Sequence, residues 1–388
     1  MDFELTETQR LIRDTARRVA REVIAPRAAE IDETGVYPED VFQAFKETEI
    51  LGTAFPEEYG GSGAGISGLV VAAEEVAKYC CASGLILLLT QLPTRPILIG
   101  GTEEQKQKWL TPVARGELKA SFCLTEPGSG SDAAAMKTYA VRDGDSYVLN
   151  GEKIFISGGT VADYCTVFAK TDRNAGARGV SAFIVPTDTP GFTITRTDRK
   201  MGVHGVPTAH FALQDVRVPA ENLVGGVEGK GFNHAMLGLN CVRPVVGARG
   251  LGLAEGTMHY ALEYARKRET FGSVITEHQA VQFMFADMAL AIEGARLAVY
   301  KAAWLVDQGR YQRQDAHFLS IAKTLATETA VKASSEAMQI LGGQGYMMDH
   351  PIERHYRDAR QLMIVEGTSQ VQRMIISRAM IEGDLSYA

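Results

Sequence analysis

The chain has 388 residues, of which 45% are hydrophobic and 22% are charged, a composition that predicts a globular protein with a sizeable core and excludes a disordered chain. Lys and Arg number 40 against 47 Asp and Glu, and the formal net charge of −7 argues against nucleic acid as a partner, because binding it needs a basic face. At roughly 150 residues per domain, the length predicts about two to three domains.

The first third of the chain reads as helices. Apolar residues at helical spacing predict a helix from Leu5 to Ile24, and Thr6 with Gln9 fits a capping box at its start. Further helices are predicted over residues 38–49, 66–78, 82–99 and 103–114, with a turn-rich break at 57–63. Pro93 and Pro96 are expected to kink the helix over 82–99.

The pattern changes near residue 120 and again near Gly231. Short apolar runs bounded by Asp-Gly and Asn-Gly turns predict strands between these points, at a spacing that suggests a small antiparallel barrel or sandwich. Helical spacing then returns in one long helix that includes residues 280–291 and another over 315–341. We therefore expect three domains: N-terminal helical (1–120), central β (121–230) and C-terminal helical (231–388).

The cysteines and the N-terminus bear on the compartment. Five cysteines, at positions 80, 81, 123, 165 and 241, are odd in number and lack zinc-site spacing, which predicts free thiols and no metal site. The first residues show no signal peptide or Arg-rich leader, and the longest apolar run, residues 85–89, is far too short to span a bilayer. We expect a cytoplasmic protein without membrane insertion.

Two glycine-rich clusters carry functional signals. Residues 122–132 combine small residues, which let backbone amides approach a ligand, with the hydroxyls of Thr125 and Ser131. A plain Gly-Ser loop at a domain junction explains that cluster about equally well. Residues 339–346 end a long helix, where glycine usually serves only as a cap.

The third cluster, residues 364–370, places Glu366 in an apolar setting immediately before a predicted helix. An acid at that place is usually an ordinary helix-start residue. A half-buried Glu can also be a general base with a raised pKa.

Together the three clusters resemble the acyl-CoA dehydrogenase family, along essentially the whole chain. The family pattern hydrophobic-Thr-Glu-Pro-x-x-Gly-Ser-Asp lies at residues 124–132. Gln-x-x-Gly-Gly-x-Gly, followed by spaced Asp, Arg and Asp, lies at 339–358, and Arg-x-x-Phe-Gly followed by Glu-His-Gln lies at 268–279. Any one motif is moderately specific, and all of them in this order are very specific.

The resemblance implies a mainly α protein with a central β domain: an N-terminal helical domain, a small β-barrel and a C-terminal four-helix bundle. It implies bound FAD, an acyl-CoA substrate, electron-transfer flavoprotein as electron acceptor, and a homotetramer. The implied reaction removes the α-proton of an acyl thioester, passes the β-hydrogen to the flavin and leaves an α,β double bond.

The resemblance also assigns the FAD contacts position by position. The flavin ring would lie against the backbone of Phe122, Leu124 and Thr125, with Phe155, Ser157 and Ser131 beside it. A guanidinium matches phosphate oxygens bidentately, which suits Arg268 to the diphosphate. The remaining diphosphate and adenosine contacts, partly on a neighbouring subunit, would be Thr270, Phe271, Gln279, Gln339, Gly343, Thr368 and Gln370.

Glu366 is the base that the resemblance implies. Apolar Ile364 and Val365 and a bound acyl chain would desolvate it and raise its pKa towards neutrality. The backbone N–H of Glu366 and a ribityl hydroxyl of FAD would polarise the thioester carbonyl. A subgroup of the family carries its base where this chain has Val242, which cannot act. Substrate contacts implied beside the base are Ser131, Arg243 and Gly367.

The sequence departs from the common pattern at several positions on the CoA side and near the thioester. The family usually has Tyr where this chain has Val365, and Asp where it has Asn240. It usually has Arg and Ser where this chain has His204 and Val206. These departures leave the chemistry intact and put a plain straight-chain substrate in doubt.

The helix over 82–99 would line the acyl pocket, and it carries Thr90, Gln91, Thr94 and Arg95. An unpaired buried guanidinium is costly, so Arg95 favours a substrate with a carboxylate or a ring, such as a glutaryl-, benzylsuccinyl- or cyclohexanecarbonyl-CoA. The alternative is that Arg95 points outward or pairs with a protein acid.

Two other function classes remain open. An oxidase of the same fold would pass electrons to oxygen; nitroalkane oxidases carry Asp at the base position, and Glu366 argues against that branch. A non-catalytic helical scaffold would not need Glu366, Arg268 and Thr125 together.

Overall fold

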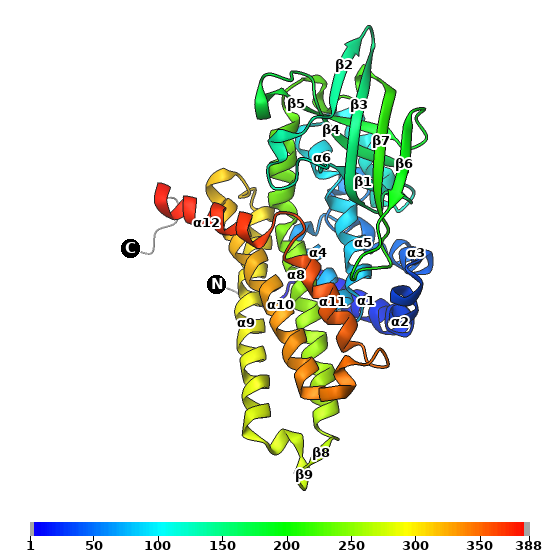
Figure 1. Ribbon diagram of the computed structural model, residues 1–388. Coiled ribbons are helices and arrows are strands. Elements are labelled where there is room, and N and C mark those ends of the chain that lie inside the picture. The colour runs from blue at the N-terminus through cyan, green and yellow to red at the C-terminus, as the bar shows by residue number, and fades with distance from the viewer. Residues whose placement is uncertain (1–3, 384–388) are drawn as a thin grey trace.

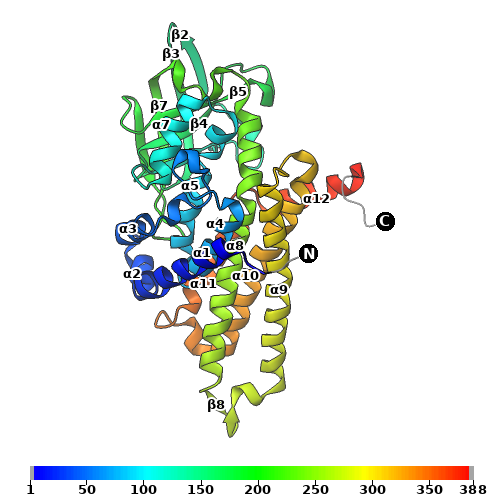
Figure 2. The same cartoon turned by 180° about the vertical axis from the view of Figure 1, so that it is seen from behind.

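The computed structural model describes residues 4–383, which fold as helices, then a β-sheet, then helices (Figures 1 and 2). The sheet lies at one end of an elongated molecule, and the long C-terminal helices extend away from it to the opposite end. The expected fold class is confirmed: a mainly α protein with a central β domain between two helical domains.

The N-terminal helices follow the predicted order. Gln9 N–H donates to Thr6 Oγ1 at 3.2 Å, which confirms the capping box. The predicted helix over 82–99 is interrupted by a turn at residues 92–94, because Pro93 has no backbone N–H to donate. The helices are α1 (Glu7–Val19), α2 (Ala25–Thr34), α3 (Glu39–Glu47), α4 (Gly65–Ala77), α5 (Cys81–Gln91), α6 (Arg95–Gly100) and α7 (Glu103–Ala114), with a π-helical segment Ala20–Ile24 between α1 and α2.

The central domain is one seven-stranded sheet in the order β1-β4-β2-β3-β7-β6, with β5 paired to β4. Most pairings are antiparallel as expected, but β1 and β2 both run parallel to β4. The pairing of β3 with β7 shifts register between Lys153 and Ile156, which marks a bulge that turns the strand locally. The strands are β1 (Ala120–Cys123), β2 (Tyr139–Asp143), β3 (Ser146–Ser157), β4 (Tyr164–Lys170), β5 (Val180–Pro186), β6 (Phe192–Thr197) and β7 (Thr208–Pro219).

The C-terminal domain is built on α8, which packs against α4, α9 and α10. Gly252 and Gly256 allow α8 to approach α4 closely, because a Cβ at either would lie 2.1 Å from the carbonyl oxygens of Glu74 and Lys78. The elements are α8 (Gly231–Ala265), β8 (Glu269–Thr270), β9 (Ser273–Val274), α9 (Gln279–Asp307), α10 (Ala316–Leu341), α11 (Ile352–Leu362) and α12 (Ser369–Glu382).

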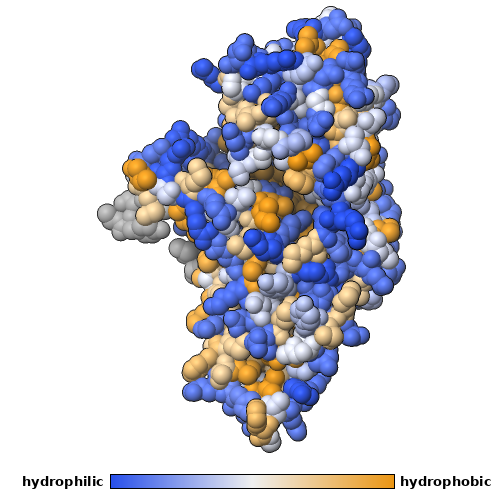
Figure 3. All heavy atoms as spheres, viewed as in Figure 1, coloured by the Kyte–Doolittle hydropathy of each residue, from blue (hydrophilic) through white to orange (hydrophobic). Residues whose placement is uncertain are grey.

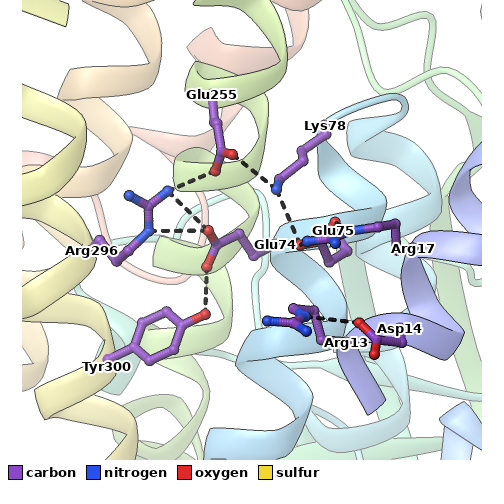
Figure 4. A network of polar contacts seen from close by, with 9 residues as sticks. All are labelled: Arg13, Asp14, Arg17, Glu74, Glu75, Lys78, Glu255, Arg296 and Tyr300. Atoms are coloured by element: carbon purple, nitrogen blue, oxygen red, sulfur yellow. Dashed lines mark hydrogen bonds and ion pairs between the residues drawn. The ribbon is translucent and has the colours of Figure 1, made fainter. Parts of the chain in front are cut away.

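A network of ion pairs joins α1, α4, α8 and α9 (Figure 4). Glu74 is buried, and it accepts hydrogen bonds from Arg296 and from the Tyr300 hydroxyl. Paired charges of this kind tolerate burial, so the network fits a structural role. Its other members are Arg17, Glu75, Lys78 and Glu255.

One run, Cys81–Gly100, is long and apolar enough to cross a membrane by length and composition, but 83% of it is buried inside the fold.

Candidate active site

Glu366 lies in the turn that joins α11 to α12. Its backbone has φ of 49°, a left-handed conformation that is uncommon for a residue with a side chain and that clusters at functional sites. Gln372 Nε2 holds the turn by donating to the carbonyls of Glu366 at 3.2 Å and Gly367 at 2.9 Å. Among the described residues, neither Glu366 Oε2, which is buried, nor the Glu366 backbone N–H has a hydrogen-bond partner.

Buried cations surround this carboxylate. Burial raises the pKa of Glu366, while the charges of Arg249 on α8 and Lys323 on α10 oppose that rise. Lys323 also donates to the Gly367 carbonyl at 2.9 Å, and burial lowers its own pKa to about 8. The site therefore carries an excess of positive charge around one unpaired acid.

Arg243, an expected substrate contact, lies on α8 near Lys323. Its Nη1 donates to Asn240 Oδ1 at 2.6 Å and contacts Ser320 Oγ at 3.3 Å, and burial lowers its pKa to about 10. Asn240, which replaces the usual Asp, also donates to the Tyr311 carbonyl. Asn240 thus positions Arg243 without neutralising it.

The loop after β1 lies beside the bulge of β3. Ile154 N–H donates to the Thr125 carbonyl at 2.9 Å, which brings Thr125 next to Phe155. Phe155 has φ of 58°, and 60% of it is exposed, so its ring lies open at the surface of this chain. An exposed aromatic ring held in a strained conformation fits stacking against a planar group such as a flavin.

A buried ion pair fixes that loop. Lys153 Nζ lies 2.8 Å from Glu126 Oε1 and donates to the Leu124 carbonyl at 3.1 Å. Glu126 in turn accepts the backbone N–H groups of Lys137 and Thr138. The Thr-Glu-Pro motif is therefore held by its own carboxylate, and its role is at least partly structural.

A second group of expected FAD contacts lies at the far end of α8. Arg268 and Thr270 line a hollow of about 380 Å³ together with Gly342 and Gly343. A Cβ at either glycine would meet nothing within 4 Å, and no ion pair holds Arg268 in the described part of the chain. Phe271, next in the loop, is fully exposed with φ of 54°. An open hollow with an unpaired guanidinium fits a diphosphate.

These two groups do not meet within one chain. The Thr125–Phe155 region belongs to the β domain at one end of Figure 1, whereas Arg268 lies beside β8 at the other end. Each group fits part of FAD, so the residues present fit the cofactor only if a second copy supplies the other part.

The remaining predicted cofactor and substrate residues differ in exposure. Thr368 is the N-cap of α12, where its Oγ1 accepts the Val371 N–H at 3.2 Å. Ser157 is partly buried, and its carbonyl accepts the Ser121 hydroxyl at 2.9 Å. Ser131, Gln279, Gln339 and Gln370 are exposed; Phe122 and Gly367 are partly buried; Leu124 is buried.

The expected acyl-pocket residues occupy the end of α5 and the start of α6. The Thr90 hydroxyl donates to the Leu87 carbonyl of α5 at 2.9 Å, and the Thr94 hydroxyl, in the turn before α6, donates to the Thr90 carbonyl at 2.5 Å. Gln91 is buried with Oε1 unpaired. Arg95 is buried too, at 9% exposed, and no acid pairs with it in residues 4–383, so it neither points outward nor forms a protein ion pair. Its charge acts on Cys241 and Tyr311 and is not among the influences on Glu366.

Sequence reasoning missed Arg249, Lys323 and Lys153. All three are completely buried. The sequence feature that could have identified them is a single Lys or Arg within an apolar helix or strand. Such residues are rarely buried unless they form an ion pair or bind a ligand.

The whole chain matches known proteins. Three family models cover it in order: "Acyl-CoA dehydrogenase, N-terminal domain" over residues 6–117, the middle domain over 121–216 and the C-terminal domain over 229–381. A probable acyl-CoA dehydrogenase, YngJ of Bacillus subtilis, is 44% identical across 98% of this chain and 100% of its own length. The short-chain-specific acyl-CoA dehydrogenase of Clostridium acetobutylicum is 43% identical across 97% of this chain and 99% of its own.

Solved structures agree with these relatives. A chain in the structure of the electron transferring flavoprotein of Acidaminococcus fermentans has a TM-score of 0.95 at 44% identity, covering 98% of this chain and 100% of that one. Butyryl-CoA dehydrogenase from Megasphaera elsdenii has a TM-score of 0.95 at 40% identity, with the same coverage of 98% and 100%.

Proposed function

The chain belongs to the acyl-CoA dehydrogenase family, and from that premise we propose that Glu366 is the base of an FAD-dependent oxidation that introduces an α,β double bond into an acyl-CoA thioester. The observation that carries the proposal is the carboxylate of the partly buried Glu366, whose buried Oε2 has no partner among the described residues. An oxygen without a partner is free to accept a proton from a substrate carbon.

The electrostatics of the site suit that proton transfer. Burial raises the pKa of Glu366 and makes it a stronger base, while Arg249 and Lys323 keep the carboxylate form accessible. The Glu366 backbone N–H, unused within residues 4–383, is available to donate to the thioester carbonyl and stabilise the charge that develops there. When bound, FAD supplies the acceptor for the β-hydrogen and its electron pair.

We propose that one FAD is held by two copies of the chain. Thr125, Phe155 and Ser157 of one copy would contact the flavin ring, and Arg268 and Thr270 of another would contact the diphosphate. Further contacts would come from Phe122, Leu124, Ser131, Phe271, Gln279, Gln339, Gly343, Thr368 and Gln370.

A homotetramer would supply that second copy. Large apolar side chains are exposed at every seventh position along α9, namely Phe283, Leu290, Leu297 and Trp304. This periodicity places them on one face of the helix, as in helices that pack against a partner. On the face of the molecule seen in Figure 1, Figure 3 shows apolar side chains gathered at the lower end of the helical part and near the middle.

We further propose electron-transfer flavoprotein as the electron acceptor, the cytoplasm as the location, and domain boundaries at 120/121 and 230/231. The match to a chain in the electron transferring flavoprotein structure supports the acceptor. Reduction of purified electron-transfer flavoprotein by substrate-reduced enzyme, compared with reoxidation in air, separates a dehydrogenase from an oxidase.

The test of the base is Glu366→Gln, measured with a panel of short acyl-CoA thioesters. The variant should keep FAD and bind acyl-CoA, but its turnover should fall by about 10²–10⁴-fold, the usual contribution of a general base. Glu33→Gln, which changes an exposed acid of α2, should leave turnover unchanged. Retention of more than about a tenth of wild-type turnover by Glu366→Gln would show that another group is the base.

A further inference from the structure

We propose that Arg249 forms an anion-binding site that recognises a carboxylate on the acyl group of the substrate, so that this enzyme prefers acyl-CoA thioesters that end in a carboxylate. The inference rests on the proposed function, because it takes Glu366 as the place where the substrate α-carbon lies. Arg249 lies among apolar residues of α8, and none of the sequence motifs assigns it a role.

The guanidinium of Arg249 is buried and mostly unpaired. The side chain is 0% exposed and is the largest fully buried side chain in the described chain. Its Nη2 donates to the Cys81 carbonyl at 3.2 Å and contacts Cys81 Sγ at 3.4 Å. Its Nε and Nη1 have no hydrogen-bond partner, and no carboxylate of residues 4–383 forms an ion pair with it. A buried charge left in this state is costly, so a bound anion would stabilise it considerably.

The start of α5 is shaped around this side chain. A Cβ at Gly84 would lie 3.3 Å from Arg249 Cγ and 3.7 Å from Nε, so the glycine gives the arginine stem its room. The neighbouring Ser83 is also fully buried, and its Oγ has no partner. Nε and Nη1 of Arg249 are thus unpaired donors of the kind from which a carboxylate accepts two hydrogen bonds, and the Ser83 hydroxyl is a further unpaired group on the helix that packs against Arg249.

The position of Arg249 relative to Glu366 points to the substrate as the source of the anion. Arg249 is the largest charge influence on Glu366, yet the two side chains form no ion pair. The nearby buried acid Asp358 is already used, since it accepts the Val203 N–H at 2.6 Å. Arg249 has no contact with solvent, so a free anion has no direct route to it. An acyl group whose thioester lies at Glu366 could carry a carboxylate to Arg249 at its inner end.

Arg95 is the competing candidate, and the structure separates the two. Arg95 packs beside Gly238 near the start of α8, where an added Cβ would lie 3.3 Å from Arg95 Cβ, whereas Arg249 lies eleven residues further along that helix. A carboxylate at the inner end of a short acyl group is therefore expected at Arg249 and not at Arg95.

The experiment compares matched pairs of thioesters: glutaryl- with pentanoyl-CoA, and succinyl- with butyryl-CoA. Affinity is measured by calorimetry in the Glu366→Gln background, where no turnover disturbs binding, and kcat/KM is measured with wild-type Glu366. The wild type should favour the carboxylate member by about 10–100-fold, as expected for charge-assisted hydrogen bonds. Arg249→Met, which keeps the stem length and removes the charge, should abolish that preference while still binding the neutral member.

Three outcomes overturn the proposal. The first is a wild type that uses pentanoyl-CoA as well as or better than glutaryl-CoA. The second is an Arg249→Met variant with the same ratio of kcat/KM for glutaryl- over pentanoyl-CoA as the wild type. The third is a preference for the carboxylate substrate that is lost in Arg95→Met and kept in Arg249→Met. Arg249→Lys serves as a second variant that retains the charge and should keep part of the preference. If wild-type enzyme oxidises pentanoyl-CoA without preferring glutaryl-CoA, only this inference fails; if it oxidises no acyl-CoA, the proposed function fails.

Discussion

Lys323 shows how a single buried residue tunes the proposed base. Its amine holds the turn through the Gly367 carbonyl, and its charge opposes the burial that raises the pKa of Glu366. Because burial lowers the pKa of Lys323 itself to about 8, that charge is fully present only below this pH. Lys323 therefore acts on the Glu366 carboxylate most strongly below about pH 8.

Replacing Lys323 by Met should shift the acid limb of the kcat–pH profile to higher pH. The sign follows from charge: without the ammonium group, the Glu366 carboxylate is less stabilised, its pKa rises further, and deprotonation needs higher pH. A kcat–pH series with a saturating short acyl-CoA measures the shift. Lys332→Met, at an exposed position of the same helix, should leave the profile in place. A shift to lower pH would contradict the assigned charge coupling.

At the scale of elements, the β3 bulge and the loop after β1 depend on the Lys153–Glu126 pair. Lys153→Met should lower the free energy of unfolding by about 3–5 kcal/mol, because it leaves the Glu126 carboxylate buried and unpaired. Chemical denaturation measures the loss. The double variant Lys153→Met/Glu126→Gln should recover part of it, and Lys137→Met, at an exposed position, should cost little. A double variant no more stable than the single one would show that the pair is not the cause.

The loop between α8 and α9 supports a prediction on cofactor retention. Arg268→Ala should release FAD on gel filtration, because it removes the unpaired guanidinium from the hollow beside Gly342 and Gly343. Arg266, two residues earlier, pairs with Glu263 at 2.6 Å, so Arg266→Ala is a matched control that should keep its flavin. The ratio of flavin to protein absorbance after gel filtration measures how much FAD each variant retains. Stoichiometric FAD in both variants would show that Arg268 does not hold the cofactor.

At the scale of the whole molecule, the two groups proposed to contact FAD lie far apart within one chain, so we expect cofactor binding to require assembly. Leu290, at 73%, is the most exposed of the four apolar residues spaced seven apart along α9. Leu290→Lys should lower the mass measured by light scattering and weaken FAD retention together, because it places a charge in the proposed interface. Val141→Lys, at an exposed apolar site on β2, should change neither. A variant that dissociates yet keeps FAD would contradict a shared site.

Motifs that are local in the sequence identified the family and pointed to Glu366 as the candidate base, because each motif places its residues within a few positions of one another. The capping box at Thr6 was predictable for the same reason: it needs only two side chains one helical turn apart. The long C-terminal helices followed from periodicity alone.

The tertiary structure decided what surrounds Glu366, the proposed base. Arg249 and Lys323 lie on α8 and α10, distant in sequence from Glu366, and only the packing of these helices against the α11–α12 turn brings their charges to bear on it. A lone cation in an apolar helix gives no sign of whether it reaches solvent, pairs with an acid or stays unpaired, because that depends on which helix faces meet. The sequence by itself determined the family and its chemistry; the packing determined the electrostatics around the proposed base and the unpaired guanidinium proposed to select the substrate.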